Sequence, residues 1–266
     1  MKREFVSIFS ISRSKETARR EANMEQKEKD DRVTHIVKIS EISEDKLIQR
    51  YKEDLVVREV EVRIKVDGKI HTQLFCLPSR FEELAIGYLN SEGLDPSHIS
   101  NIEVEEVNPE IYEIQVKSEK RVYRNPSKVA SEIKIKKEEV RELVKKLEKG
   151  SILYKATGGT HVVASFDQKR EAFFIEDISR HCAIDKLIGT CIKHGIEISE
   201  SVLVTSCRHT HSTIKKVIFA GFPVVISVSG PTELAIRDAA EFGITLIGFA
   251  RDNRFNVYTN DWRILR

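Results

Sequence analysis

The chain has 266 residues, of which 40% are hydrophobic, so it is long enough for one or two domains with real cores. Its 44 basic and 42 acidic residues leave a net charge of +2, which gives no reason to expect a protein that coats nucleic acid. No apolar run approaches the ~18 residues that span a bilayer, and the four cysteines include no C-x-x-C pair. These features favour a reduced, cytoplasmic protein and argue against a signal peptide, a disulfide scaffold and the simplest zinc-ribbon or iron–sulfur sites.

The first 32 residues differ in composition from the rest. Residues 13–32 are nearly all charged or polar and carry no apolar stripe of helical spacing. Such a segment cannot bury enough surface to fold alone. We expect either a flexible tail or a mis-assigned start of translation, because Met24 is the only methionine after Met1.

Residues 33–117 predict a smaller β-rich α+β domain. Residues 58–66 alternate between apolar and polar side chains up to Asp67-Gly68, which is a hairpin turn signal. The pattern then predicts a returning strand, a helix and a second strand pair, over residues 70–77, 80–91 and 102–116. Residues 118–137 are polar and basic, contain Asn125-Pro126, and form the predicted linker.

Residues 138–266 predict a larger α/β domain. An amphipathic helix over 138–149, stopped by Gly150, opens it. A hairpin and a further helix follow, over residues 162–175 and 179–193. The remaining pattern is β-α-β-α-β with short connections, over residues 201–206, 211–221, 223–228, 231–243 and 244–249. Short connections of this kind predict three parallel strands with right-handed crossovers.

Ligands of such sheets bind beyond the carboxyl ends of the strands. The three predicted strand ends are Ser206-Cys207-Arg208, Ser229 to Thr232, and Phe249 to Arg254. They are rich in hydroxyl groups and arginine, and two of them run into helix N-termini, which favour anions. This combination predicts a site for a phosphorylated ligand. The alternative is that Ser229 and Thr232 are ordinary helix caps and the arginines are solvated.

Two more groups of residues are candidates for the site. Thr157-Gly158-Gly159-Thr160-His161 places paired glycines before a strand, as close backbone approach to a ligand requires, although a plain turn is the alternative. Arg180, His181 and Asp185 lie at the start of one helix, with His181 and Asp185 at i,i+4 spacing. A carboxylate beside the imidazole would fix its tautomer, and an ordinary cap with a surface ion pair is the alternative.

The cysteines suggest one reactive thiol and no metal site. Cys207-x-His209-x-His211 lies at a strand-to-helix junction, where this spacing spreads the side chains apart. A helix N-terminus and Arg208 would favour the thiolate of Cys207, which makes it the candidate reactive cysteine. Cys76 and Cys191 lie in apolar stripes and are expected in the core, and the role of Cys182 stays open.

These motifs together resemble the FdhD family of formate dehydrogenase accessory sulfurtransferases. Thr157 to His161 is similar to the family's TGGTHAA, and Glu176 to Lys186 is similar to its EDVGRHNALDK. Ser206 to Arg208 stands where the family has SGR or SSR. Further similar segments, spread over roughly residues 55–260, are Glu83 to Gly93 (ELALGFLLTEG), Ser229 to Thr232 (SAPT), Gly248-Phe249 and Asn256 to Thr259.

The resemblance implies a cytidine deaminase-like larger domain and a defined role. Family members take sulfur from a cysteine desulfurase and pass it to the molybdenum (or tungsten) bis-molybdopterin guanine dinucleotide cofactor. They bind this cofactor as a client before its insertion into the formate dehydrogenase apoenzyme. Members are often dimeric, but this sequence carries no interface signature, so its oligomeric state stays open.

The residue patterns and the resemblance together give a set of candidate site residues. The family's cofactor-binding loop corresponds to the last predicted strand end. The predicted cofactor-binding residues are Thr157, Gly158, Gly159, His161, Arg180, His181, Asp185, Arg208, Ser229, Phe249, Ala250, Arg251, Asp252, Asn253 and Arg254.

One departure from the family affects the expected chemistry. The family carries sulfur on a C-G-V-C loop, but the corresponding residues 120–130 contain no cysteine. A persulfide needs a thiolate, so either Cys207 replaces that loop or the protein binds and delivers the cofactor without sulfur transfer. Whether the chain is an enzyme therefore stays open. The H-x-E and P-C-x-x-C signatures of zinc deaminases are also absent, so deamination is not expected.

Overall fold

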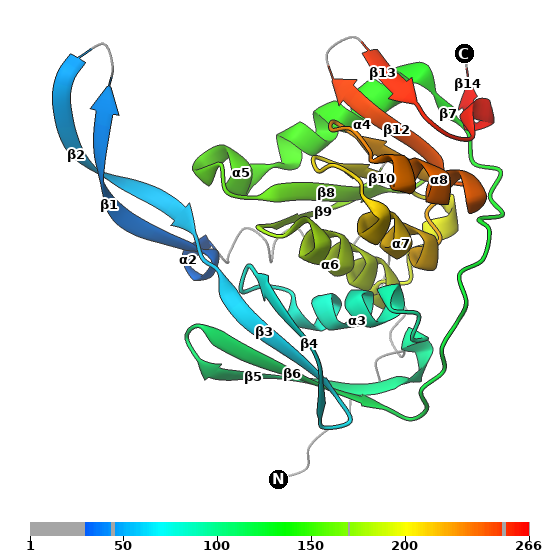
Figure 1. The fold of residues 1–266 in the computed structure, drawn as a ribbon, viewed down its shortest axis with the longest axis horizontal. Coiled ribbons are helices and arrows are strands. Elements are labelled where there is room, and N and C mark those ends of the chain that lie inside the picture. Colours follow the sequence, from blue (N-terminus) through cyan, green and yellow to red (C-terminus); the bar gives the residue numbers. More distant parts are fainter. Residues whose placement is uncertain (1–29, 44–45, 170, 252–253, 266) are drawn as a thin grey trace.

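The computed structural model describes residues 30–43, 46–169, 171–251 and 254–265 (Figure 1). Within these ranges the protein is a mixed α/β structure with a four-stranded sheet, a six-stranded sheet and two pairs of strands. Residues 1–29 lie outside the described residues, so the interpretation of the first 32 residues stays a prediction. No helix in the described ranges is long and apolar enough to cross a membrane.

An antiparallel hairpin, which we call the arm, projects from the body of the molecule (Figure 1). It consists of β1 (Thr34–Ser43) and β2 (Lys46–Val57) and follows the short helix α2 (Asp30–Val33). At the base of the arm, Val57 joins a hydrophobic cluster that also contains Val33 of α2.

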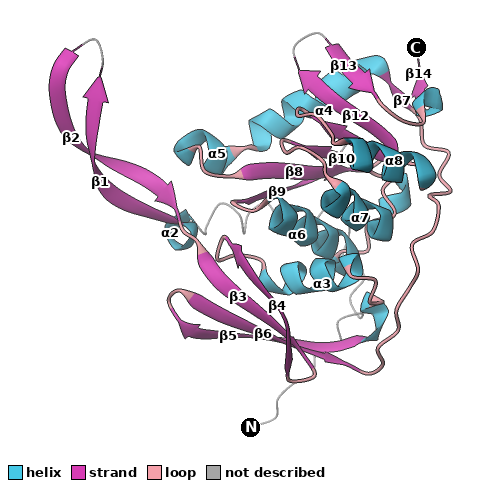
Figure 2. Ribbon diagram, viewed as in Figure 1, coloured by secondary structure: helices cyan, strands magenta, loops and turns pink. Residues whose placement is uncertain are grey.

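The four-stranded sheet has the order β4-β3-β6-β5 and is covered by one helix (Figure 2). Its elements are β3 (Val60–Val66), β4 (Lys69–Cys76), α3 (Phe81–Ser91), η1 (Pro96–His98), β5 (Ile99–Asn108) and β6 (Ile111–Ser118). Alternate residues of β3 are buried, and Asp67 and Gly68 both have positive φ in the turn. The predicted hairpin, helix and strand pair are confirmed.

The six-stranded sheet has the order β13-β12-β11-β10-β8-β9. Its strands are β8 (His161–Phe166), β9 (Ala172–Asp177), β10 (Val202–Thr205), β11 (Val224–Ser227), β12 (Thr245–Arg251) and β13 (Arg254–Val257). The predicted parallel pairing of β10, β11 and β12 is confirmed. The likeness of this unit to a cytidine deaminase stays a prediction.

Helices cover both faces of this sheet (Figures 1 and 2). The apolar residues of α6, α7 and α8 form one core cluster, and those of α4 form another on the opposite face. The bounds are α4 (Lys137–Gly150), α5 (Ile152–Thr157), α6 (Arg180–Lys193), η2 (Ile198–Glu200), α7 (His211–Ala220) and α8 (Glu233–Glu241). Gly150 is the last residue of α4, and α5 was not predicted.

The two sheets form one packed body because α3 and α6 cross at close range. A Cβ on Gly87 would lie 1.8 Å from the carbonyl oxygen of Asp185, and one on Gly189 would lie 1.9 Å from that of Glu83. Only glycine allows this approach of two backbones. The smaller sheet therefore docks on the larger unit through α3.

The linker follows the side of the molecule away from α5 (Figure 1). The Val129 amide donates to the carbonyl of Phe242 (2.9 Å), just before β12 begins. The linker ends at β7 (Ile135–Lys136), which pairs with β14 (Ile264–Leu265) after η3 (Asp261–Arg263). The linker therefore crosses the amino-terminal edge of the parallel strands.

Candidate functional site

A cavity of about 660 Å³ lies at the carboxyl ends of the parallel strands. One wall carries Ser206, Ser229 and Arg251, which come from the ends of β10, β11 and β12. The other wall is formed by the end of α4, by α5 and by residues 158–161. The structure thus brings the strand ends and the paired-glycine segment, which are far apart in sequence, around one space.

A buried carboxylate shapes the second wall. Glu176 accepts hydrogen bonds from the backbone N–H groups of Ile152 (2.6 Å), Leu153 (2.9 Å) and Tyr154 (2.8 Å). It also accepts one from the hydroxyl of Thr160 (2.8 Å). One side chain therefore holds both α5 and the glycine segment. Sequence reasoning missed this role, although Glu176 opens the second family-like motif.

The paired glycines are held tightly. Gly158 has φ +70°, and its N–H donates to the carbonyl of Tyr154 (2.7 Å). A Cβ on Gly159 would lie 2.8 Å from Val57 at the base of the arm. Larger residues would strain the first position and displace the arm at the second. Thr157 helps to fix this segment, because its hydroxyl accepts a hydrogen bond from the Gly159 N–H (3.2 Å).

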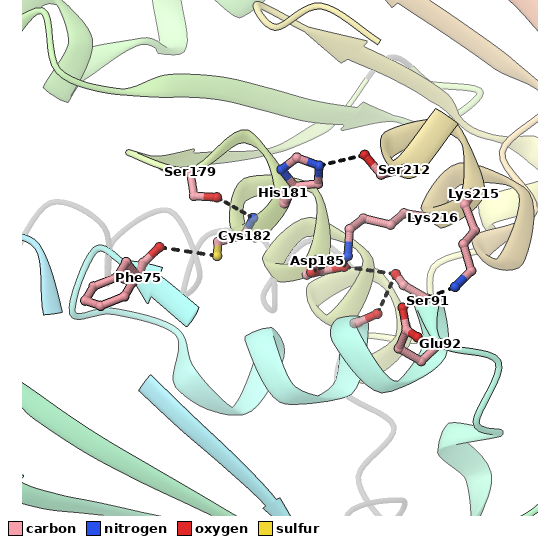
Figure 3. Close-up of polar contacts among 11 residues, drawn as sticks. Phe75, Ser91, Glu92, Ser179, His181, Cys182, Asp185, Ser212, Lys215 and Lys216 are labelled. Atoms are coloured by element: carbon pink, nitrogen blue, oxygen red, sulfur yellow. Dashed lines mark hydrogen bonds and ion pairs between the residues drawn. The ribbon is translucent and has the colours of Figure 1, made fainter. Parts of the chain in front are cut away.

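Two histidines near the cavity have lowered pKa values. Burial and the charges of Arg180 and Arg208 lower the pKa of His161, which lines the cavity. Burial, followed by the charge of Arg180, lowers the pKa of His181 to about 4. A 2.9 Å hydrogen bond joins His181 Nε2 to Ser212 Oγ (Figure 3). Arg180 thus lies close enough to both imidazoles to affect them.

Asp185 does not pair with His181, and that expectation was wrong. Its carboxylate is buried and accepts hydrogen bonds from Lys216 Nζ (2.7 and 2.9 Å) and from the Ser91 hydroxyl (2.9 Å) (Figure 3). These contacts join α3, α6 and α7. The packing of α7 against α6 places the ammonium group of Lys216 beside the Asp185 carboxylate, and this cation is a stronger partner than the neighbouring imidazole. Asp185 is not among the residues that line the cavity.

The last strand end is a hairpin and not the simple loop that the sequence suggested. β12 continues to Arg251, and β13 begins at Arg254, both in the same antiparallel pair. Phe249 has φ +51° at an irregularity in this pairing. Ala250 is buried, whereas Arg251 and Arg254 are exposed. Asp252 and Asn253 lie outside the described residues.

The other strand ends combine capping and bridging contacts. Thr232 caps α8, since its side chain accepts from the Ala235 N–H (3.4 Å). The alternative prediction of an ordinary helix cap is therefore confirmed for this residue. Ser229 is not a cap, because its hydroxyl donates to the carbonyl of Ser206 (3.0 Å) and ties two strand ends together. Arg208, two residues after Ser206, is exposed.

The environment of Cys207 disfavours a thiolate. All four cysteines are buried, and Cys207 is 1% exposed. Burial raises the pKa of the Cys207 thiol, which outweighs the nearby positive charge of Arg180. The expectation of a favoured thiolate was therefore wrong, because it considered the helix end but not the burial. Its role as a sulfur carrier stays a prediction.

The Cys-x-His-x-His segment does not converge on one point. His209 Nε2 contacts Thr205 Oγ1 (3.0 Å), while His211 Nδ1 contacts Asp238 (2.6 Å) on α8. Among the described residues, no group of three or more His, Cys, Asp or Glu side chains is placed to hold a metal ion.

Comparison with known proteins gives consistent matches. The model of the FdhD/NarQ family matches residues 57–265. The sulfur carrier protein FdhD of Bacillus subtilis (strain 168) is 35% identical over 240 residues, covering 80% of this chain and 91% of that protein. The protein of the same name from Methanothermobacter thermautotrophicus is 31% identical over 228 residues, covering 79% and 91%.

A solved structure shares the fold. It was assigned to a formate dehydrogenase accessory protein from Desulfotalea psychrophila and aligns with a TM-score of 0.76 at 23% identity. The alignment covers 88% of this chain and all of that one. Nearly all of the arm precedes residue 57, where the match to the family model begins.

Proposed function

This chain belongs to the FdhD/NarQ family, and from that premise we propose that it is an accessory protein of formate dehydrogenase that binds the bis-molybdopterin guanine dinucleotide cofactor as a client. The molybdenum or tungsten arrives as part of that client. The cavity at the strand ends receives one nucleotide end of the cofactor. Its volume of about 660 Å³ suits a group of that size, so the rest of the larger client lies outside.

Unpaired positive charge beside the cavity carries this proposal. Arg180, Arg208 and Arg251 have no carboxylate within ion-pair distance among the described residues. Two of them depress the pKa of His161, which lines the cavity. Arginine forks that lack a protein partner are suited to bind phosphate oxygens. A diphosphate would supply the missing negative charge.

Delivery without sulfur transfer fits the cysteines best. The linker that replaces the family's cysteine loop crosses the amino-terminal edge of the sheet, opposite the cavity. The four thiols are buried. We therefore propose that this chain hands the cofactor to a formate dehydrogenase apoenzyme in the cytoplasm.

Sulfur transfer through Cys207 is the second candidate. The observation in its favour is position, because Cys207 follows Ser206, which lines the cavity. In that case a cysteine desulfurase would be a second protein partner. The buried thiol would have to become exposed before it could accept sulfur.

Thermal unfolding with GDP tests the binding role. GDP is expected to raise the melting temperature of the wild-type protein, and Arg251→Ala is expected to reduce this shift without lowering the melting temperature of the free protein. Arg237→Ala is the matched control, because Arg237 is an exposed arginine of α8 outside the cavity lining. An unchanged melting temperature of the wild type at millimolar GDP would contradict the proposal.

Intact-protein mass spectrometry separates the two candidates. After incubation with a cysteine desulfurase and cysteine, delivery alone predicts no added sulfur atom. An added sulfur that disappears in Cys207→Ser but persists in Cys191→Ser would establish the second candidate. The desulfurase must load a known acceptor in the same experiment.

A further inference from the structure

The cavity wall opposite the strand ends carries an acidic side chain at its rim. Glu148 lies in the last turn of α4, is exposed, and lines the cavity. Its carboxylate makes no hydrogen bond or ion pair with any other described residue. The nearby Lys155 donates instead to the carbonyl of Lys149 (3.2 Å). A carboxylate in the last turn of a helix also opposes the helix dipole, so Glu148 does not serve helix stability.

An aromatic ring lies on the same wall. Tyr154 is 53% exposed and lines the cavity. Its ring has no stacking partner in the described part of the chain. The backbone of Tyr154 is held by the buried carboxylate of Glu176 (2.8 Å). A large exposed ring on a fixed support suits stacking against a flat ligand.

The two walls differ in chemistry. The strand-end wall offers Arg251 and the hydroxyl of Ser206, which accepts from the Val162 N–H (3.0 Å) and keeps its own proton to donate, and both suit phosphate. The helical wall offers a carboxylate and an aromatic ring, which suit a base. A carboxylate only accepts hydrogen bonds. Guanine presents two adjacent donors, N1–H and the 2-amino group, whereas adenine presents an acceptor at N1. The helical wall therefore suits guanine and disfavours adenine.

We propose that Glu148 selects guanine by accepting hydrogen bonds from N1–H and the 2-amino group, while Tyr154 stacks on the base. The phosphates then point to Arg251 on the opposite wall. This assignment rests on the proposed function, because it places the guanine end of the client in the same cavity. It adds the residues that distinguish one nucleotide from another.

Titration calorimetry on the full chain with GDP, IDP and ADP tests the assignment. The wild type is expected to bind GDP most tightly, IDP less tightly because it lacks the 2-amino group, and ADP least. Glu148→Gln should weaken GDP binding roughly tenfold, as expected for a damaged two-bond pair, and leave ADP unchanged. Glu142→Gln is the matched control, because Glu142 is exposed on the same helix but outside the cavity lining.

Variants of Tyr154 test the stacking separately. Tyr154→Leu should weaken the binding of GDP and of ADP by a similar factor, because stacking does not depend on the edge of the base. Tyr154→Phe keeps the ring and should bind both nucleotides as the wild type does. If Glu148→Gln keeps the full preference for GDP over ADP, the inference is wrong while nucleotide binding stands. Equal affinity of the wild type for GDP and ADP would likewise contradict the inference and leave nucleotide binding intact. If the wild type binds none of the three, the proposed function itself fails.

Discussion

The two edges of the six-stranded sheet differ in how their buried polar groups are hydrogen-bonded. At the amino-terminal edge, the buried Arg263 donates to the carbonyls of Ser131 (3.1 Å) and Gly243 (2.8 Å) and to Thr245 Oγ1 (3.2 Å). At the carboxyl edge, the buried Nδ1 of His209 and Nε of Arg180 have no partner among the described residues. In these contacts the amino-terminal edge satisfies its polar groups within the chain, whereas the carboxyl edge leaves a neutral imidazole nitrogen and the guanidinium of Arg180 without a partner among the described residues.

At the carboxyl edge itself, the last two residues of β9 have different roles. Glu176 holds the cavity wall, as described above. Asp177 turns the other way, accepts from Lys186 Nζ (2.5 Å) and from the Leu77 N–H (3.3 Å), and so fixes the smaller sheet to the larger unit. Strand alternation explains the division, because successive side chains point to opposite faces. Changes to side chains that support the cavity and changes to side chains that only pack the fold should therefore have separable effects.

The largest loss of stability is expected at Glu176, which supports the cavity wall. Glu176→Ala leaves three backbone N–H groups and one hydroxyl without their acceptor and should cost roughly 3 kcal/mol or more of unfolding free energy. It should also remove stabilisation by GDP. Urea unfolding with and without GDP measures both, and Glu142→Ala, at an exposed position of α4, is the comparison for a surface carboxylate. A loss below about 1 kcal/mol would contradict the role of Glu176.

A pH-dependent effect of similar size should come from His209. Burial and Arg180 lower its pKa to about 4 in the folded protein, against about 6.5 when unfolded. Between these values the unfolded state binds more protons, so stability is complete above pH ~6.5 and falls as the pH drops towards 4. The total loss should approach about 3 kcal/mol. His209→Gln should flatten this part of the profile relative to wild type, and parallel profiles would contradict the prediction.

A smaller loss of stability is expected for a change at the amino-terminal edge. Arg263→Met keeps much of the side-chain volume but leaves the acceptors of Ser131, Gly243 and Thr245 unpaired. We expect the free energy of unfolding to fall by about 2 kcal/mol. The GDP-induced shift should remain, because the residue lies at the opposite edge from the cavity. Loss of GDP binding in a variant that remains folded would show that the two edges are not independent.

The smallest change in stability is expected at the cavity. Arg251 is exposed, so Arg251→Ala should change the free energy of unfolding by no more than about 0.5 kcal/mol. GDP binding should nevertheless weaken by roughly tenfold or more, since a charge-assisted phosphate contact is lost. Calorimetry and urea unfolding on the same preparation separate the two quantities. A large stability loss would assign Arg251 to the structural edge.

Sequence patterns were sufficient for elements with a strong period or a local signal. The β-α-β-α-β unit and the hairpin at Asp67-Gly68 are of this kind. The short helix α5 was missed, because its N–H groups are satisfied by Glu176 from a distant strand. β13 was missed because it is only four residues long and contains no apolar run.

The candidate site was predictable in position but not in its contacts. The rule for strand ends led to Ser206, Ser229 and Arg251, which line the cavity. The partner of Asp185 lies 31 positions away on another helix, so i,i+4 reasoning could not identify Lys216. The burial of Cys207 likewise depends on its place in a core cluster with residues of α6, α7 and α8. Local spacing carries no information on such tertiary contacts.

A crystal structure of the protein with GDP is the most direct test of the account. We predict the diphosphate against Arg251 and the Gly158-Gly159 segment, with the guanine between Tyr154 and Glu148. GDP bound at the amino-terminal edge beside the linker, or anywhere outside this cavity, would contradict the assignment of the carboxyl edge as the ligand site.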